Sequence, residues 1–190
     1  MSFVSAQTIG FVWLVWLAYW WIAARGAKQN RRVESFASRL SHFGPLIVAA
    51  LLLWPATLPG GFLCERFLPA TPATFYAGFA VLVLGLGFSI WARHVIGRNW
   101  SGIVTVKQDH ELVRSGPYRW VRHPIYTGLL TGFLGSAIAR GEWRGLLAVA
   151  IVFAALWRKL KLEERWMIET FGDAYVRYRA EVRALIPFVL

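Results

Sequence analysis

Two polar stretches in the second half of the chain hold the side chains that could do chemistry, and the first covers residues 107–128. It contains Pro117 and Pro124, each of which fixes its own φ and keeps the residue before it out of helical geometry. Pro124 suits the first turn of a helix, so Arg122 and His123 are expected beside exposed amides that favour an anionic ligand group. A basic anchor with a helix-starting proline is the alternative interpretation.

The second polar stretch covers residues 158–178 and alternates acidic and basic groups. Lys159 and Glu163 are four residues apart and therefore share one helix face. A carboxylate there can accept hydrogen bonds from hydroxyls or offset the charge of a cofactor. Gly172 is expected to end this helix, so that the tyrosines after it fold back over a pocket. A solvated, salt-bridged helix extension is the alternative interpretation.

The composition excludes an ordinary soluble domain as the setting for this chemistry. Of the 190 residues, 57% are hydrophobic and 16% are charged, whereas about a quarter of the residues in soluble domains are charged. The single cysteine, Cys64, excludes an internal disulfide and a cysteine-based zinc site, and no metal is expected. These features predict an integral membrane protein.

Five apolar segments are candidate transmembrane helices. They cover residues 8–24, 43–63, 74–92, 124–139 and 143–157. The last two are separated only by residues 140–142, a spacing typical of a tight helical hairpin. In the fourth segment, small residues recur every four positions, a pattern that lets membrane helices approach closely. These residues are Gly128, Gly132 and Ser136.

The basic residues predict an orientation. The loops 25–42 and 93–123 and the tail from Arg158 carry five, six and seven of the 21 Lys and Arg residues. The positive-inside rule places these segments in the cytoplasm, so the N-terminus is expected outside and the C-terminus in the cytoplasm. The net charge of +11 is therefore attributed to membrane topology, and no nucleic-acid partner is expected.

Residues 1–190 are expected to form one all-α membrane domain, a polytopic bundle of about five transmembrane helices. Residues 1–92 supply three hydrophobic helices with few polar groups, whereas residues 93–190 concentrate the His, Tyr and Glu residues. We therefore expect the chemistry in a cytoplasmic pocket formed by the C-terminal half.

Motifs in the last 90 residues or so resemble those of the isoprenylcysteine carboxyl methyltransferase family, membrane enzymes related to phospholipid methyltransferases. They are H-E-L-V-R-S-G-P-Y-R-W-V-R-H-P-I-Y-T-G at 110–128, L-E-E at 162–164 and F-G-D-A-Y-V-R-Y at 171–178, followed by L-I-P at 185–187. The shorter R-H-P-x-Y pattern is shared with phospholipid N-methyltransferases, thiol S-methyltransferases and membrane sterol reductases.

The resemblance implies binding of S-adenosylmethionine by the C-terminal half. The implied cofactor contacts are His110, Glu111, Leu112, Val113, Tyr118, His123, Pro124, Ile125, Tyr126 and Glu163, with Thr105, Val106 and Lys107 added by position alone. Lys159 and Glu163 are the implied catalytic residues, and Lys159 would also bind the acceptor. Relatives carry an arginine where this chain has Lys159, and lysine lacks the planar fork that matches a carboxylate.

The implied reaction suits such a site, because the positive charge of a sulfonium disappears during methyl transfer and the protein mainly positions the reactants and excludes water. Glu163 could accept the ribose hydroxyls, and amides near His123 could hold the methionine carboxylate. Tyr118 and Tyr126 could flank the adenine or the sulfonium. The acceptor is expected to be lipid-like and to arrive through a gap between the third, fourth and fifth spans.

Three alternatives to a methyltransferase acting on a prenylcysteine-type carboxylate stay open. The acceptor could be a phospholipid amine or a thiol. The chain could instead be an NADPH-dependent sterol or enone reductase, although the first three spans offer only Tyr19 and Tyr76 as phenol donors, near their ends. Finally, it could be a membrane assembly protein without enzymatic activity. The oligomeric state does not follow from the sequence.

Overall fold

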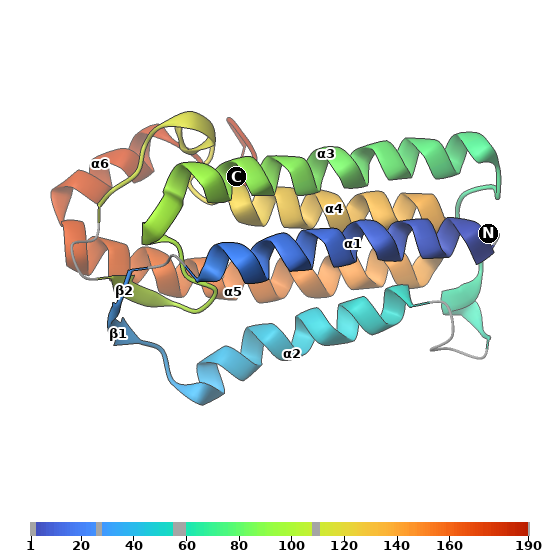
Figure 1. Cartoon of the computed structure of the whole chain (residues 1–190), viewed down its shortest axis with the longest axis horizontal. Coiled ribbons are helices and arrows are strands. Elements are labelled where there is room, and N and C mark those ends of the chain that lie inside the picture. Colours follow the sequence, from blue (N-terminus) through green and yellow to red (C-terminus); the bar gives the residue numbers. More distant parts are fainter. Residues whose placement is uncertain (1–2, 26–27, 55–59, 108–110, 190) are drawn as a thin grey trace.

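The computed structural model describes residues 3–25, 28–54, 60–107 and 111–189, which form a bundle of long helices (Figure 1). The helices are α1 (Phe3–Ala24), α2 (Phe36–Leu53), α3 (Pro72–Ile96), α4 (Pro124–Arg140), α5 (Trp143–Phe171) and α6 (Asp173–Glu181). The 3-10 turns are η1 (Phe62–Cys64), η2 (Gly97–Asn99) and η3 (Gly116–Arg119). A helical bundle is therefore confirmed.

Three of these helices are long and apolar enough to cross a membrane, over Gln7–Ala24, Phe36–Leu53 and Pro72–Asn99. Most side chains in these windows are not buried inside the bundle, as expected for helices surrounded by lipid. The helices predicted at 124–139 and 143–157 form as α4 and α5. By length and composition α4 and α5 do not qualify as spans, so the count of five stays a prediction.

The predicted second span is wrong in its bounds, because α2 covers 36–53 rather than 43–63. Ser35 caps the helix by accepting a hydrogen bond from the Ser38 amide at 3.2 Å, which lets the helix begin before the apolar run does. The helix ends before Trp54, and a proline follows at position 55, which disfavours helical geometry in the residue before it.

A two-stranded antiparallel sheet is the departure from the all-α prediction within the described residues. Strand β1 (Asn30–Val33) pairs with β2 (Thr105–Lys107), with Val33 opposite Thr105. Beyond the strand, the Glu34 amide donates to the Val104 carbonyl at 3.0 Å. Because the two strands come from distant parts of the chain, no local pattern in either one indicates the pairing. The sheet ties the N-terminal half to the segment before the first polar stretch.

Glycines bring the backbones of α3 and α4 into direct contact. A Cβ added at Gly135 would lie 2.2 Å from the Leu82 nitrogen, and one at Gly128 would lie 2.5 Å from the Gly85 oxygen. The small-residue pattern predicted in α4 is therefore confirmed, and glycines of α3 complete it. Such close packing leaves no room for a lipid chain between α3 and α4, so that part of the expected acceptor route is closed.

Gly135→Ala is expected to destabilise the protein by about 3 kcal/mol, because the new methyl group meets backbone rather than a movable side chain. Gly87→Ala is the matched control, since nothing lies within 4 Å of its Cβ position. The control is expected to change stability by less than about 1 kcal/mol. Thermal unfolding in detergent micelles measures both variants, and equal losses would contradict the role of Gly135.

Tryptophans of α1 hold that helix against the α3–α4 pair. The Trp16 indole donates to Ser89 Oγ at 2.8 Å, and the Trp13 indole donates to Ser136 Oγ at 3.1 Å. These two rings are therefore hydrogen-bonded within the bundle and do more than face lipid. An indole needs such a partner when it is buried.

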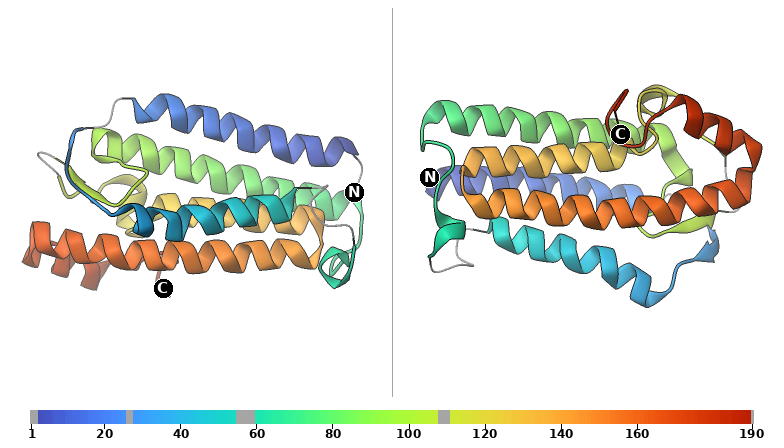
Figure 2. Two further views of the ribbon diagram at one scale, coloured as in Figure 1. Left: turned by 90° about the horizontal axis from the view of Figure 1, so that it is seen from below. Right: turned by 180° about the vertical axis from the view of Figure 1, so that it is seen from behind.

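The turn between α4 and α5 lies at the end of the bundle opposite α6 (Figure 2). The three basic residues outside the segments predicted to be cytoplasmic are Arg66, Arg140 and Arg144, and the last two flank this turn. Arg140 Nη1 donates to the Leu53 carbonyl at 2.9 Å, and Arg144 Nη1 donates to the Trp54 carbonyl at 3.2 Å. Arg66 Nε donates to the Leu68 carbonyl at 2.9 Å. Two of these guanidiniums therefore cap the carboxyl end of α2, where the helix dipole favours positive charge.

Candidate functional site

Both polar stretches meet at one end of the bundle, where α4 begins and α5 extends beyond its apolar half toward α6 (Figure 1). A pocket of about 140 Å³, partly open to solvent, lies there. Of the residues predicted to contact a cofactor, those lining this pocket are Glu111, Leu112, Val113, Tyr118, His123, Pro124, Ile125, Tyr126 and Glu163. His110 and the side chains of Val106 and Lys107 lie outside the described part of the structure.

Part of the pocket wall was missed by reasoning from the sequence. The additional lining residues are Ile96, Asn99, Trp100, Ser101 and Ile103 after α3, with Met167 and Phe171 from α5. Thr105, a candidate by position alone, also lines the pocket. Helix α3 continues to Ile96, beyond the predicted limit of 92, and so carries the following segment to the pocket. For the residues after α3, the sequence signal is proximity to the 107–128 stretch. Met167 and Phe171 follow Glu163 on α5, and Phe171 begins the F-G-D-A-Y-V-R-Y motif.

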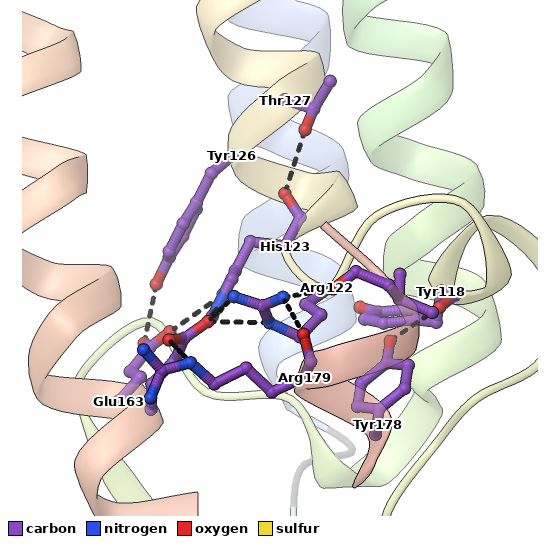
Figure 3. Close-up of polar contacts among 10 residues, drawn as sticks. Tyr118, Arg122, His123, Tyr126, Thr127, Glu163, Tyr178 and Arg179 are labelled. Atoms are coloured by element: carbon purple, nitrogen blue, oxygen red, sulfur yellow. Dashed lines mark hydrogen bonds and ion pairs between the residues drawn. The ribbon is translucent and has the colours of Figure 1, made fainter. Parts of the chain in front are cut away.

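Glu163 is at the centre of a polar group on α4 and α5 (Figure 3). The Tyr126 hydroxyl donates to Glu163 Oε1 at 2.6 Å, and His123 Nδ1 lies 3.6 Å from Glu163 Oε2. The rings of His123 and Tyr126 are stacked, with centroids 5.4 Å apart and an interplanar angle of 6°. These contacts hold the carboxylate in a defined orientation at the pocket wall.

Lys159 lies behind Glu163 rather than in the pocket wall. Its Nζ is 3.9 Å from Glu163 Oε1 and donates to the Gly102 carbonyl at 2.7 Å. The side chain is buried between the rings of Phe43 and Tyr126, whose centroids lie 6.0 Å and 5.4 Å from Nζ. The structure thus places the expected i, i+4 pair side by side, with the ammonium in an aromatic surrounding.

Glu164 is the residue that organises Arg122 and His123. The L-E-E motif includes it, but no role in the site was predicted for it. Its Oε1 accepts from Arg122 Nε at 2.8 Å and lies 3.3 Å from His123 Nε2. Glu164 is 3% exposed. Successive residues on a helix point about 100° apart, so Glu164 faces Arg122 and the Nε2 side of His123, whereas Glu163 contacts Tyr126 and the Nδ1 side of His123.

Arg122 lines the pocket at the start of α4, as expected, but its guanidinium is already paired within the protein. Its guanidinium is bound by Glu164 and also donates to the carbonyls of Val182 and Arg179, the latter at 3.2 Å (Figure 3). Burial alone would raise the pKa of Glu164, but hydrogen bonds and charges from His123 and Arg122 outweigh it and lower the pKa to about 2. The carboxylate is thus ionised near neutral pH.

Residues 182–185, which we call the C-terminal strap, run beside the start of α4. The amides of Arg122 and His123 donate to the carbonyls of Arg183 and Ala184 at 2.8 Å and 3.0 Å. The Thr127 hydroxyl donates to the Leu185 carbonyl at 2.7 Å. The two amides expected to hold an anionic ligand group are thus already bonded, and the strap instead fixes the backbone that carries His123.

Tyrosines close the side of the pocket nearest α6. Gly172, with a φ of 54°, ends α5, and α6 then folds Tyr175 and Tyr178 into the pocket wall, as predicted. The Tyr178 hydroxyl donates to the Tyr118 carbonyl at 2.6 Å. Burial raises the pKa of Tyr178 to about 12, so this phenol stays neutral and keeps its hydrogen bond at physiological pH.

Buried polar groups of the N-terminal half reach the same end of the bundle, although only apolar helices were expected there. Glu34 accepts from the Val104 amide at 2.9 Å and from the Ser38 hydroxyl at 2.6 Å. His42, 1% exposed, has its Nε2 3.3 Å from Glu34 Oε1. Residue 43, next to this histidine, supplies one of the rings beside Lys159.

A known protein family matches the part of the chain that forms this site. A family model described as phospholipid methyltransferase matches residues 73–174, more than half of the chain. The chain belongs to the phospholipid methyltransferase family. The matched region covers α3, α4 and α5 together with the first polar stretch, and thus most of the pocket wall.

The curated relatives of this chain include methyltransferases with different named substrates. The protein-S-isoprenylcysteine O-methyltransferase of Saccharomyces cerevisiae is 32% identical over 126 residues, which cover 63% of this chain and 52% of that protein. Methanethiol S-methyltransferase 1 of Bradyrhizobium diazoefficiens is 37% identical over 71 residues, which cover 37% of this chain and 24% of that protein. The chain spans about half the length of the curated isoprenylcysteine relatives it matches.

A solved structure shares the fold of this family member. The eukaryotic intramembrane Ras methyltransferase ICMT (isoprenylcysteine carboxyl methyltransferase) matches with a TM-score of 0.53 and 25% identity. The match covers 80% of this chain and 52% of that one. The resemblance to isoprenylcysteine carboxyl methyltransferases is thereby confirmed, and the chain is an integral membrane protein with their fold.

Proposed function

We propose that this protein is a methyltransferase that uses S-adenosylmethionine and acts on a hydrophobic, membrane-associated acceptor. The observation that carries the proposal is the convergence of two polar stretches, one before α4 and one at the end of α5, on a single pocket. The leading acceptor is a prenylcysteine-type carboxylate, the group named in the relatives' titles as protein-S-isoprenylcysteine. The reaction is then a carboxyl O-methylation.

The pocket suits S-adenosylmethionine in its chemistry. Ligand pockets typically combine apolar walls with a few fixed polar groups. Leu112, Val113 and Ile125 supply apolar surface for a base, and Glu163 supplies a carboxylate that can accept from hydroxyls. Tyr118 lines the same wall.

The protein's part in such a reaction is positioning and exclusion of water. S-adenosylmethionine supplies a methyl group on a sulfonium, so no nucleophilic side chain is required. Glu163 is held by the Tyr126 hydroxyl before any ligand arrives, so it needs little reorganisation on binding. Tyr175, Tyr178 and the strap close the pocket around the start of α4, which limits the access of water.

Lys159 supports an anionic acceptor over a cationic one. Its ammonium is buried behind Glu163 and bound to the Gly102 carbonyl, so it would act on an acceptor through its positive charge, which favours a carboxylate. The same positive charge disfavours a protonated amine. We therefore rank the possible acceptors in the order carboxylate, thiol, phospholipid amine. The methanethiol relative is the reason for ranking the thiol second.

The proposal includes a membrane arrangement. Helices α1 to α5 form five spans in one domain over residues 1–190, with the N-terminus outside and the pocket and C-terminus at the cytoplasmic face. The pocket end of the bundle carries the predicted cytoplasmic loops. At the other end, Arg66, Arg140 and Arg144 each donate a hydrogen bond to a backbone carbonyl. This separation of charge supports the orientation.

A binding titration of the purified protein in detergent tests the reaction class. S-adenosylmethionine is expected to bind with a dissociation constant in the micromolar range, at about −8 kcal/mol, and NADPH is expected not to bind. Binding of NADPH without binding of S-adenosylmethionine would favour a reductase and refute the proposal. Binding of neither ligand would favour a nonenzymatic protein. A labelled-methyl assay with prenylcysteine, phosphatidylethanolamine and thiol acceptors then identifies the substrate.

The single cysteine tests the orientation. Cys64, in η1, is half-buried and lies at the end of the bundle away from the pocket. A small membrane-impermeant thiol reagent is expected to label it from outside intact cells, and Cys64→Ser to abolish the label. The matched control, Cys64→Ser combined with Asp173→Cys in exposed α6, is expected to react only after lysis. The reverse pattern would invert the proposed topology.

A further inference from the structure

A second cavity of about 540 Å³ lies on the other side of η3 and the strap from the pocket already described. Its walls are Arg119, Trp120, Ala180, Glu181, Val182, Arg183, Pro187 and Phe188. None of these residues lines the first pocket, so the two are distinct sites. The strap contributes to the second cavity through Val182 and Arg183, while its carbonyls hold the start of α4.

The second cavity carries a positive charge that the described residues do not neutralise. Arg119 and Arg183 are both exposed, and within the described ranges neither guanidinium has a hydrogen bond or an ion pair. Glu181 also lines the cavity, but its carboxylate is paired with Arg114. Two arginine forks without an acidic partner match the geometry of a phosphate group.

An apolar side of the same cavity continues onto the surface of α3 that faces lipid. Trp120 is 54% exposed, and its ring lies 5.4 Å from that of Trp91 and 6.4 Å from that of Phe88, measured between centroids. Both partners belong to the candidate span Pro72–Asn99. Phe188, which also lines the cavity, is 95% exposed. Exposed indole and phenyl rings beside arginines are typical of the boundary between the hydrocarbon and the headgroups.

We propose that this cavity binds the headgroup of an anionic phospholipid. Arg119 and Arg183 bind the phosphate, and an acyl chain passes between Trp120 and Phe188 toward the outer surface of α3. The proposal depends on the membrane location of the chain and not on its proposed methyltransferase activity. Because the Arg183 carbonyl also accepts from the Arg122 amide, a bound lipid would hold the strap against the start of α4.

The test is the melting temperature of the purified full-length chain in a neutral detergent, with phosphatidylglycerol or phosphatidylcholine added. Phosphatidylglycerol is expected to raise it by about 5 °C more than phosphatidylcholine does, since a ligand that binds only the folded state stabilises it. Arg119→Gln combined with Arg183→Gln is expected to abolish the difference. Arg165→Gln combined with Arg177→Gln removes the same charge from exposed positions outside the cavity and is expected to keep it.

Several outcomes would overturn the proposal. The first is an equal response of the wild type and the Arg119/Arg183 variant to phosphatidylglycerol. The second is loss of the response in the Arg165/Arg177 control, which would assign the effect to overall charge. The third is an equal rise with inorganic phosphate, which would make the site one for a free anion. None of these readouts uses methyl transfer, so failure here leaves the proposed function untouched.

Discussion

Glu164→Gln is expected to destabilise the protein by about 3 to 5 kcal/mol, the cost of removing one partner from a buried ion pair. The Arg122 guanidinium, whose Nη2 lies 2.6 Å from Glu164 Oε1, would stay buried without its counter-charge. His123 would lose the contact of its Nε2, and the strap would lose part of its support because Arg122 also holds the Val182 carbonyl. Thermal and denaturant unfolding in detergent measure the change.

Glu169→Gln is the matched control on the same helix. Glu169 pairs with Arg32 at 2.6 Å, but both side chains are largely exposed. An exposed ion pair contributes less than about 1 kcal/mol, so this variant is expected to be close to the wild type. Equal stability losses in the two variants would show that burial of the Glu164 pair has no special role.

The same carboxylate predicts a pH dependence of stability. Its pKa in the folded protein is about 2, below the ordinary value of 4.5. A carboxyl group with a lowered pKa stabilises the fold fully above its unfolded pKa, and this contribution is lost as the pH falls from there toward about 2. The stability difference between wild type and Glu164→Gln is therefore expected to shrink over this range. A constant difference from neutral pH to pH 2 would contradict the assignment.

Glu163→Gln is expected to weaken binding of S-adenosylmethionine by about 10-fold to 100-fold, since a hydrogen bond to a charged group contributes about 1.5 to 3 kcal/mol. Methyl transfer should fall at least as much. The substitution keeps the shape of the side chain but removes the charge that Tyr126, His123 and Lys159 face. Titration of the ligand and the labelled-methyl assay measure the two effects.

Two further variants separate the contributions at this position. Tyr126→Phe removes the hydroxyl that donates to Glu163 but keeps the ring stacked on His123, and is expected to weaken binding by about 10-fold. Glu169→Gln again serves as the charge control and should bind normally, because that residue lies outside the pocket wall. Normal binding by Glu163→Gln would remove Glu163 from the site.

Local signals predicted much of the helical framework. Proline at 124 begins α4 and glycine at 172 ends α5, because each of these residues restricts or frees the backbone at its own position. The spacing of Gly128 and Gly132 predicted a close helix contact for a similar reason, since the absence of a side chain on one face depends only on helical periodicity. Residues from the family motifs line one pocket.

Interactions between distant segments needed the tertiary structure. Reading along the chain, Glu163 and Glu164 are equivalent neighbours, yet one lines the pocket and the other binds Arg122. Nothing near His123 indicates that its amide is bonded to Ala184. Helix starts, helix ends and apolar faces follow from the conformational preferences of a few adjacent residues, whereas the partner of a buried charge or amide depends on which segments the packed bundle brings within hydrogen-bond distance.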